Sequence, residues 1–271
     1  MVDEIKLALL QISTGPDKEE NLEKTISKIR DLEENVDLAI APEYLMGLKD
    51  GDLTKELLKK NYEPLDSWFL ESFREEANKS DISLLLTTYR KENGDCFNSS
   101  VFVDDDGEIL GVYDKIHLFD AFDHKESDFF RYGENITVFE WNSLNIGLAT
   151  CFDLRFPELF RILKFHGADI VLVPSGFYAG SHKSEQWRTL ISSRAHENNL
   201  FVVGVNQPKP YFVGESQVSS PLGYEIDKLG EQEEVGIVTI APEEVEESWR
   251  QMPMNKLIRS NFYKKYDPYR D

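Results

Sequence analysis

The sequence has few cysteines, no long apolar run and a shortage of basic residues, and each lack excludes a class of protein. Two cysteines in 271 residues make neither a disulfide framework nor a zinc-binding set. No apolar stretch approaches the ~20 residues that a membrane-spanning helix needs. The first residues, MVDEIKLALLQIS, are too acidic for a secretion signal. We therefore expect a cytoplasmic protein that has no membrane partner and binds no metal.

Basic residues are scarce relative to acidic ones. The 30 lysines and arginines face 50 aspartates and glutamates, which gives a net charge of −20. A field of this sign repels nucleic acid and anionic lipid surfaces, so neither is an expected partner. The acidic residues are spread along the chain, and we interpret most of them as a solvated surface. An anionic small molecule would need local positive charge in order to bind.

Short apolar runs alternate with segments of helical periodicity in the first third of the chain, a pattern typical of a layered α/β fold. The predicted strands there are residues 5–12, 36–41 and 82–88, and the predicted helices are residues 17–34 and 65–79. Further strands are predicted at 99–103, 108–113, 145–150, 169–173, 200–206, 216–220 and 235–240, with a helix over 184–198. Residues 115–133 lack a period and are predicted to form a long loop. No linker or repeat interrupts these elements, so we predict one domain over 1–271, with a core at about 4–241 and a tail over 242–271.

Cys151 lies where the predicted strand over 145–150 meets an amphipathic run with an early proline. A thiol at such a bend is exposed beside the free backbone N–H groups of the next turn. Those groups lower the pKa of a thiol and can donate to an oxyanion, as a nucleophile requires. The alternative is that Cys151 is a small buried apolar residue, the more common role of a free cysteine.

Three other polar residues also follow apolar strands: Glu43, Lys115 and Ser175. The active sites of layered α/β domains lie at the carboxyl ends of strands, so we expect these residues at one edge. A cysteine nucleophile needs a base and a cation, which Glu43 and Lys115 can supply. Each residue alone could equally be a solvated surface residue.

Three motifs in this order resemble those of the nitrilase superfamily of carbon–nitrogen hydrolases. They are APEY at Ala41–Tyr44, YDKIHLFD at Tyr113–Asp120 and TCFDLRFPEL at Thr150–Leu159. The resemblance covers nearly the whole chain and implies a four-layer α-β-β-α sandwich, a homodimer or higher homo-oligomer, and catalysis without a cofactor. It also implies that Glu43 is the general base, Lys115 the oxyanion-stabilising cation and Cys151 the nucleophile.

Two further roles follow from the resemblance. The backbone N–H of Phe152 is expected to be the second oxyanion donor. A second glutamate after the lysine, which orients the substrate in this superfamily, corresponds best to Glu126 in HKESDFFRYG, with Glu134 as the competing residue.

The residues after Cys151 bear on the substrate. Phe152 and Asp153 stand where a Trp–Glu pair would indicate nitrile hydrolysis, and CFDLRF resembles the omega-amidase branch. That branch cleaves small linear amides, including monoamides of dicarboxylic acids, and releases ammonia. There Arg155 would bind the distal carboxylate of the substrate, although it could instead pair with Asp153 or Glu158.

Three points stay open from the sequence alone. Tyr44 and Phe177 either line the substrate pocket or pack in the core. One alternative function is hydrolysis of an N-carbamoyl amino acid, which would also release carbon dioxide. Another is a non-catalytic scaffolding protein that retains the fold.

Overall fold

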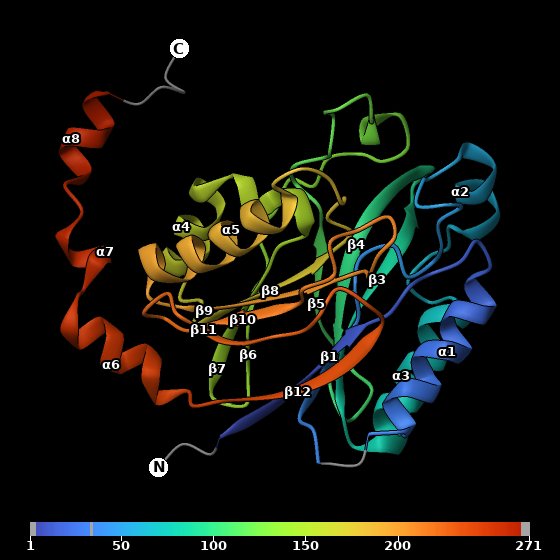
Figure 1. The fold of residues 1–271 in the computed structure, drawn as a ribbon, viewed down its shortest axis with the longest axis horizontal. Helices are drawn as coiled ribbons and strands as arrows, with labels where there is room; N and C mark the ends of the chain where they lie inside the picture. Colours follow the sequence, from blue (N-terminus) through green and yellow to red (C-terminus); the bar gives the residue numbers. More distant parts are fainter. Residues whose placement is uncertain (1–3, 33–34, 267–271) are drawn as a thin grey trace.

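Two sheets lie face to face in the protein, whose computed structural model describes residues 4–32 and 35–266 (Figure 1). Within these residues each sheet has six strands. The first sheet has the order β12 (Glu234–Ile240), β1 (Ile5–Gln11), β2 (Leu38–Ile40), β3 (Ser83–Glu92), β4 (Asp95–Val103) and β5 (Ile109–Asp114). The second has the order β11 (Glu225–Lys228), β10 (Gln217–Ser219), β9 (Phe201–Asn206), β8 (Ile170–Ser175), β7 (Leu144–Leu148) and β6 (Val138–Trp141).

Helices cover the outer face of each sheet. The first sheet carries α1 (Lys18–Arg30) and α3 (Trp68–Ser80), with α2 (Lys55–Asn61) near one end, and the second carries α4 (Pro157–Phe165) and α5 (Lys183–Asn198) (Figure 1). Separate apolar clusters fill the space under each helical layer and the space between the sheets. The four-layer α-β-β-α sandwich implied by the resemblance is therefore confirmed.

The apolar run of β1 shows why the strands form in these places. Leu7 and Leu9 belong to the cluster between the sheets, whereas Ala8 and Leu10 belong to the cluster under the first helical layer. Because both faces of the strand are buried, its sequence is almost continuously apolar rather than alternating. The same reasoning applies to β8, whose six residues are all buried.

The direction of the strands determines where their following residues lie. β1, β2 and β3 are parallel, β4 is antiparallel to β3, and β5 is antiparallel to β4. β5 therefore points the same way as β2. In the second sheet β7, β8 and β9 are parallel. The residues that follow β2 and β5 thus leave one edge of the first sheet, and those that follow β7 and β8 leave one edge of the second.

Several elements differ from the sequence prediction. α2, β6 and β11 were not predicted, because they are short and the two strands lie at the edges of the second sheet, with few buried positions to create a pattern. The predicted loop over 115–133 contains one short 3₁₀ turn, η1 (Glu126–Asp128). The predicted first helix extended into residues 33 and 34, which lie outside the described residues.

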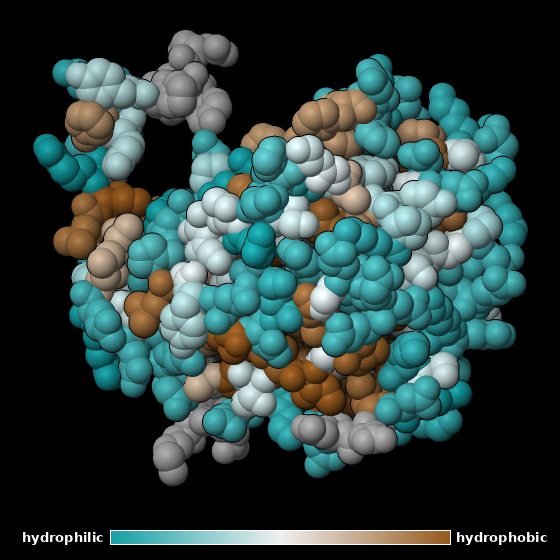
Figure 2. Space-filling model, in the orientation of Figure 1, coloured by the Kyte–Doolittle hydropathy of each residue, from teal (hydrophilic) through white to brown (hydrophobic). Residues whose placement is uncertain are grey.

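The segment after β12 forms an arm along one side of the molecule (Figure 1). Its described part consists of α6 (Glu243–Gln251), α7 (Met254–Leu257) and α8 (Ser260–Lys265). Brown patches interrupt the hydrophilic surface along this arm in Figure 2, and its exposed large apolar residues are Met252, Leu257, Phe262, Tyr263 and Tyr266. Across residues 4–32 and 35–266, none of the helices combines the length and apolar character required to cross a bilayer.

Candidate active site

The structure brings Glu43, Lys115, Cys151 and Glu126 together between the edges of the two sheets. Glu43 follows β2 and Lys115 follows β5, whereas Cys151 follows β7 in the facing sheet. All four side chains are buried. The expectation that residues after the strands share one region of the fold therefore agrees with the structure. Glu134, the alternative to Glu126, is exposed.

Lys115 is bonded to two carboxylates. Its Nζ lies 2.8 Å from Glu43 Oε1 and 2.8 Å from Glu126 Oε2. Burial alone would lower the pKa of Lys115, but the attraction of Glu126 and Glu43 outweighs burial and raises it well above 10.5. This shift favours the charged ammonium form of Lys115.

Asn98 joins the same two carboxylates from the middle of β4. Its Nδ2 donates to Glu43 Oε1 at 2.8 Å and to Glu126 Oε1 at 2.9 Å. The sequence did not single out this residue, because an asparagine within a strand has no distinguishing pattern. With Lys115, it fixes the separation and orientation of the two glutamates.

Glu43 is held at its second oxygen and at its backbone. The Gly176 N–H donates to Oε2 at 2.8 Å, and Gln207 Nε2 donates to the Glu43 carbonyl at 2.7 Å. Burial raises the pKa of Glu43 above its usual 4.5, although Lys115 opposes this shift. A carboxylate with a raised pKa accepts a proton more readily, which is the property required of a general base.

Ser175, the fourth residue that follows an apolar run, acts through its backbone. It is the last residue of β8, and its carbonyl accepts the Glu43 N–H at 3.4 Å and the Gln207 N–H at 3.2 Å. Its hydroxyl donates to the Val173 carbonyl at 3.1 Å. Ser175 thus ties the Glu43 segment to the second sheet.

Cys151 begins the 3₁₀ turn η2 (Cys151–Arg155) in a left-handed conformation, with φ 44°. This conformation is strained for a residue with a side chain, and such strain is common at nucleophiles on tight strand-to-helix turns. The side chain is 7% exposed, and the charges of Glu43 and Lys115 both act on its thiol.

The pKa of the Cys151 thiol is shifted in the direction opposite to the sequence expectation. Burial raises it well above 9.0, and the charge of Glu43 raises it further, against the opposing effect of Lys115. Burial outweighs the lowering that backbone N–H groups contribute, and the sequence reveals the turn but not how deeply it is buried. A raised pKa favours the neutral thiol, and a neutral thiol needs a base in order to act as a nucleophile.

The turn beside Cys151 is anchored by Asp153. Its Oδ2 accepts the Tyr113 hydroxyl at 2.7 Å and the Thr150 N–H at 2.8 Å. Its Oδ1 accepts the His117 N–H at 3.1 Å and lies 2.7 Å from His117 Nδ1. Asp153 therefore connects the turn that carries Cys151 with the segment around Lys115, which is a structural role.

The Phe152 N–H lies at the start of the turn η2. The first hydrogen bond of η2 runs from the Asp153 N–H to the Thr150 carbonyl, so the preceding N–H of Phe152 has no role within the turn. An oxyanion formed beside Cys151 could accept from this group and from the Lys115 ammonium.

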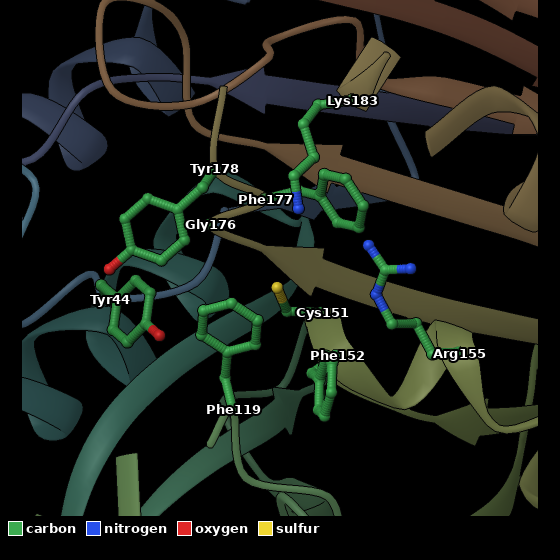
Figure 3. Close-up of a pocket in the computed structure, with 9 residues that line it drawn as sticks. All are labelled: Tyr44, Phe119, Cys151, Phe152, Arg155, Gly176, Phe177, Tyr178 and Lys183. Carbon is green, nitrogen blue, oxygen red and sulfur yellow. The ribbon is translucent and has the colours of Figure 1, made fainter. Parts of the chain in front are cut away.

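A pocket of about 320 Å³, including its open mouth, lies over the Cys151 sulfur (Figure 3). Tyr44 and Phe177, for which the sequence left two interpretations, both line it, and Phe177 also packs against Trp187. The complete lining is Tyr44, Phe119, Cys151, Phe152, Arg155, Gly176, Phe177, Tyr178 and Lys183. Lys183 was not identified from the sequence, since a lysine at the start of a helix is ordinarily a surface residue.

Arg155 faces this pocket. Its Nη2 donates to Gln186 Oε1 at 2.9 Å, and its guanidinium lies 5.3 Å from the centre of the Phe177 ring. Asp153, one of the proposed partners, uses its oxygens for the contacts described above. Among residues 4–32 and 35–266, no carboxylate lies within ion-pair distance of the Arg155 guanidinium. In the same residues, no group of three or more His, Cys, Asp or Glu side chains could hold a metal ion.

Comparisons with known proteins agree with the motifs and the fold. The model of the carbon–nitrogen hydrolase family matches residues 6–251. A deaminated glutathione amidase of Escherichia coli O157:H7 is 30% identical, over 87% of this chain and 90% of that protein. The omega-amidase NIT3 of Saccharomyces cerevisiae is 28% identical, over 96% of this chain and 94% of that protein.

A solved structure gives the same result for the fold. The crystal structure of Saccharomyces cerevisiae Nit3, described as a member of branch 10 of the nitrilase superfamily, has a TM-score of 0.83 to this chain. It is 26% identical, and the match covers 94% of this chain and 97% of that one. The resemblance predicted from the three motifs is therefore confirmed.

Proposed function

Because the chain is an amidase that belongs to the carbon–nitrogen hydrolase family, we propose that it hydrolyses small linear amides through a thioester at Cys151. The observation that carries this proposal is the buried hydrogen bond of 2.8 Å between Lys115 Nζ and Glu43 Oε1, close to the Cys151 thiol that lines the pocket. The proposed nucleophile thus faces the pocket, and the proposed base and cation are buried beside it. This function replaces the non-catalytic scaffold considered from the sequence.

The first half of the reaction forms the thioester. Glu43 accepts the Cys151 proton, and the thiolate attacks the amide carbon while the carbonyl electrons move to oxygen. The Lys115 ammonium and the Phe152 N–H stabilise that oxyanion. When the tetrahedral intermediate collapses, the C–N bond breaks and protonated Glu43 gives its proton to the leaving nitrogen.

The second half returns the enzyme to its starting state. Glu43 accepts a proton from water, and the resulting hydroxide attacks the thioester carbon. The same two donors stabilise the second oxyanion, after which the C–S bond breaks and Glu43 returns the proton to sulfur. Glu126 keeps Lys115 and the substrate in position throughout, and it takes no part in making or breaking covalent bonds.

The proposed substrate is the monoamide of a dicarboxylic acid, with ammonia as the first product. Arg155 supports this choice because its guanidinium faces the pocket and can bind a carboxylate through two parallel hydrogen bonds. The names of the similar proteins, deaminated glutathione amidase and omega-amidase, also describe enzymes that cleave amides.

The test is ammonia release from a panel of substrates by the wild type and by Cys151→Ala. The panel contains succinamate, neutral aliphatic amides, an N-carbamoyl amino acid and a nitrile. We expect release from succinamate that disappears in Cys151→Ala. Release by the variant at the wild-type rate would refute the thiol mechanism. Turnover of the carbamoyl compound alone, with release of carbon dioxide, would agree with the thiol mechanism but would refute the monoamide as the substrate.

We also propose that the protein is a cytoplasmic homodimer. Both of its cysteines are free thiols, as expected in a reducing compartment. The outer face of α4 exposes Ile162 and Phe165, and the arm of α6–α8 exposes further apolar residues, as described above. A second copy of the chain would cover these surfaces. Light scattering should give twice the mass of one chain, and the double variant Ile162→Glu with Phe165→Glu should give the mass of one chain.

A further inference from the structure

Lys183 reaches the pocket from the first residue of α5. Figure 3 shows its amino group and the Arg155 guanidinium beside the Phe177 ring, whereas Tyr44 lies on the other side of the Cys151 sulfur. The two cations come from separate helical turns, since Arg155 ends η2 and Lys183 begins α5. They converge on one wall of the pocket beside the nucleophile.

Aromatic rings hold Lys183 in this position. Its Nζ lies 4.4 Å from the centre of the Phe122 ring and 5.5 Å from that of Phe177, the same ring that Arg155 approaches to 5.3 Å. Attraction between a cation and the face of an aromatic ring is favourable but does not neutralise the charge. Phe177 therefore supports two like charges at once.

Neither cation has a carboxylate partner within the described parts of the chain. Burial lowers the pKa of Lys183, and the charge of Arg155 lowers it further. This pairing of like charges is unfavourable, and it occurs in a protein whose net charge is −20. The sequence contains 50 aspartates and glutamates, yet none of those that the structure describes forms an ion pair with Arg155 or Lys183.

The charges in and beneath the pocket do not sum to zero. Glu43 and Glu126 each contribute one negative charge, whereas Lys115, Arg155 and Lys183 each contribute one positive charge. The pocket and the network beneath it therefore lack one negative charge. A substrate with a single carboxylate, placed between Arg155 and Lys183, would make the site neutral.

We propose that Lys183 is a specificity-determining residue that binds the distal carboxylate of the substrate together with Arg155. The planar guanidinium of Arg155 donates to the carboxylate oxygens along one edge, and the compact ammonium of Lys183 donates to the same oxygens from the mouth of the pocket. This inference rests on the proposed function, because it concerns the acid group of the amide that Cys151 attacks.

The experiment compares succinamate with butanamide, in which a methyl group replaces the carboxylate. The variant is Lys183→Gln, and the matched control is Lys59→Gln, which removes the same charge from an exposed position on α2. The ratio of kcat/KM for succinamate to that for butanamide should fall roughly tenfold in Lys183→Gln. It should not change in Lys59→Gln. Lys183→Arg should restore most of the ratio, because it restores the charge.

A binding measurement separates this inference from the proposed function. In the Cys151→Ala background, calorimetry measures succinamate binding without turnover, and adding Lys183→Gln should weaken that binding by roughly tenfold. Equal binding with and without Lys183→Gln, or no succinamate binding at all, would overturn the inference. If the wild type did not hydrolyse amides, the proposed function would be overturned instead. The binding measurement would then decide the role of Lys183.

Discussion

The charged groups contributed by the two sheets differ in whether they have charged partners. The first sheet and its following loop provide a buried network of Glu43, Asn98, Lys115 and Glu126, in which every charge bonds another member. The second sheet and its helices provide the cations Arg155 and Lys183, which have aromatic and amide partners in the described residues but no carboxylate.

This difference separates two kinds of function. A buried network whose charged groups are all paired forms before the substrate arrives, so its geometry serves the chemical steps. Arg155 and Lys183 repel each other unless an anion binds both of them, so their geometry serves substrate binding. Loss of a network member should therefore reduce both stability and kcat, whereas loss of a pocket cation should change KM and leave stability intact.

The strongest test of the comparison is Lys115→Met. Without the ammonium ion, Glu43 and Glu126 become two buried carboxylates with no counter-ion, which should lower the free energy of unfolding by ~3–5 kcal/mol. The lost oxyanion donor should reduce kcat by at least ~10²-fold. Urea denaturation and ammonia release measure the two effects, and Lys59→Met is the surface control. A near-normal kcat would remove Lys115 from the catalytic role proposed for it.

Asn98→Ala should have a smaller effect of the same kind. Removing one donor shared by two carboxylates should reduce kcat by roughly 30-fold with little change in KM, since hydrogen bonds to charged groups contribute about 1.5–3 kcal/mol. The Asn98 N–H stabilises ionised Glu43, so its loss should also move the acid limb of the pH profile to higher pH. The control is Asn78→Ala, which removes an exposed side chain that donates to the Asp106 carbonyl. An unchanged pH profile would indicate a purely structural role for Asn98.

The wild-type pH profile tests the state of Glu43 itself. Burial raises the pKa of this carboxyl above 4.5, and protonated Glu43 cannot accept the thiol proton. The value of kcat/KM should therefore fall as pH decreases through a value above 4.5, by ~10-fold per pH unit below it. Lys115 retains its charge because Glu126 and Glu43 raise its pKa, so its deprotonation should produce no alkaline limb near neutral pH. An acid limb at or below 4.5 would contradict the assignment of Glu43 as base.

Much of the network was predictable because its members follow strands. Glu43, Lys115 and Cys151 each come after an apolar run, and the parallel direction of β2 and β5, like that of β7 and β8, brings such residues to shared edges. Glu126 required the resemblance, since the loop that carries it has no periodicity. These assignments of role stay predictions until the variants are measured.

The remaining parts depend on tertiary packing, which a single sequence does not display. Asn98 lies within β4, and nothing in its local sequence indicates that two glutamates from other segments meet its side chain. Lys183 resembles a surface lysine until the position of Phe177 is known. The raised pKa of Cys151 likewise results from its burial in the folded protein rather than from its turn.

Arg155→Met should have the smallest effect on the fold and a selective effect on the substrate. Removing a cation that Lys183 repels should leave the melting temperature unchanged or slightly higher, in contrast to Lys115→Met. The KM for succinamate should rise by roughly tenfold relative to that for butanamide, because a charge-assisted hydrogen bond to the distal carboxylate is lost. The control is Arg250→Met, an exposed arginine on α6 that pairs with Glu246. If kcat/KM falls equally for both substrates and the melting temperature also falls, the hydrogen bond from Arg155 to Gln186 is structural. Arg155 would then not be one of the substrate-binding cations that distinguish the second sheet from the first.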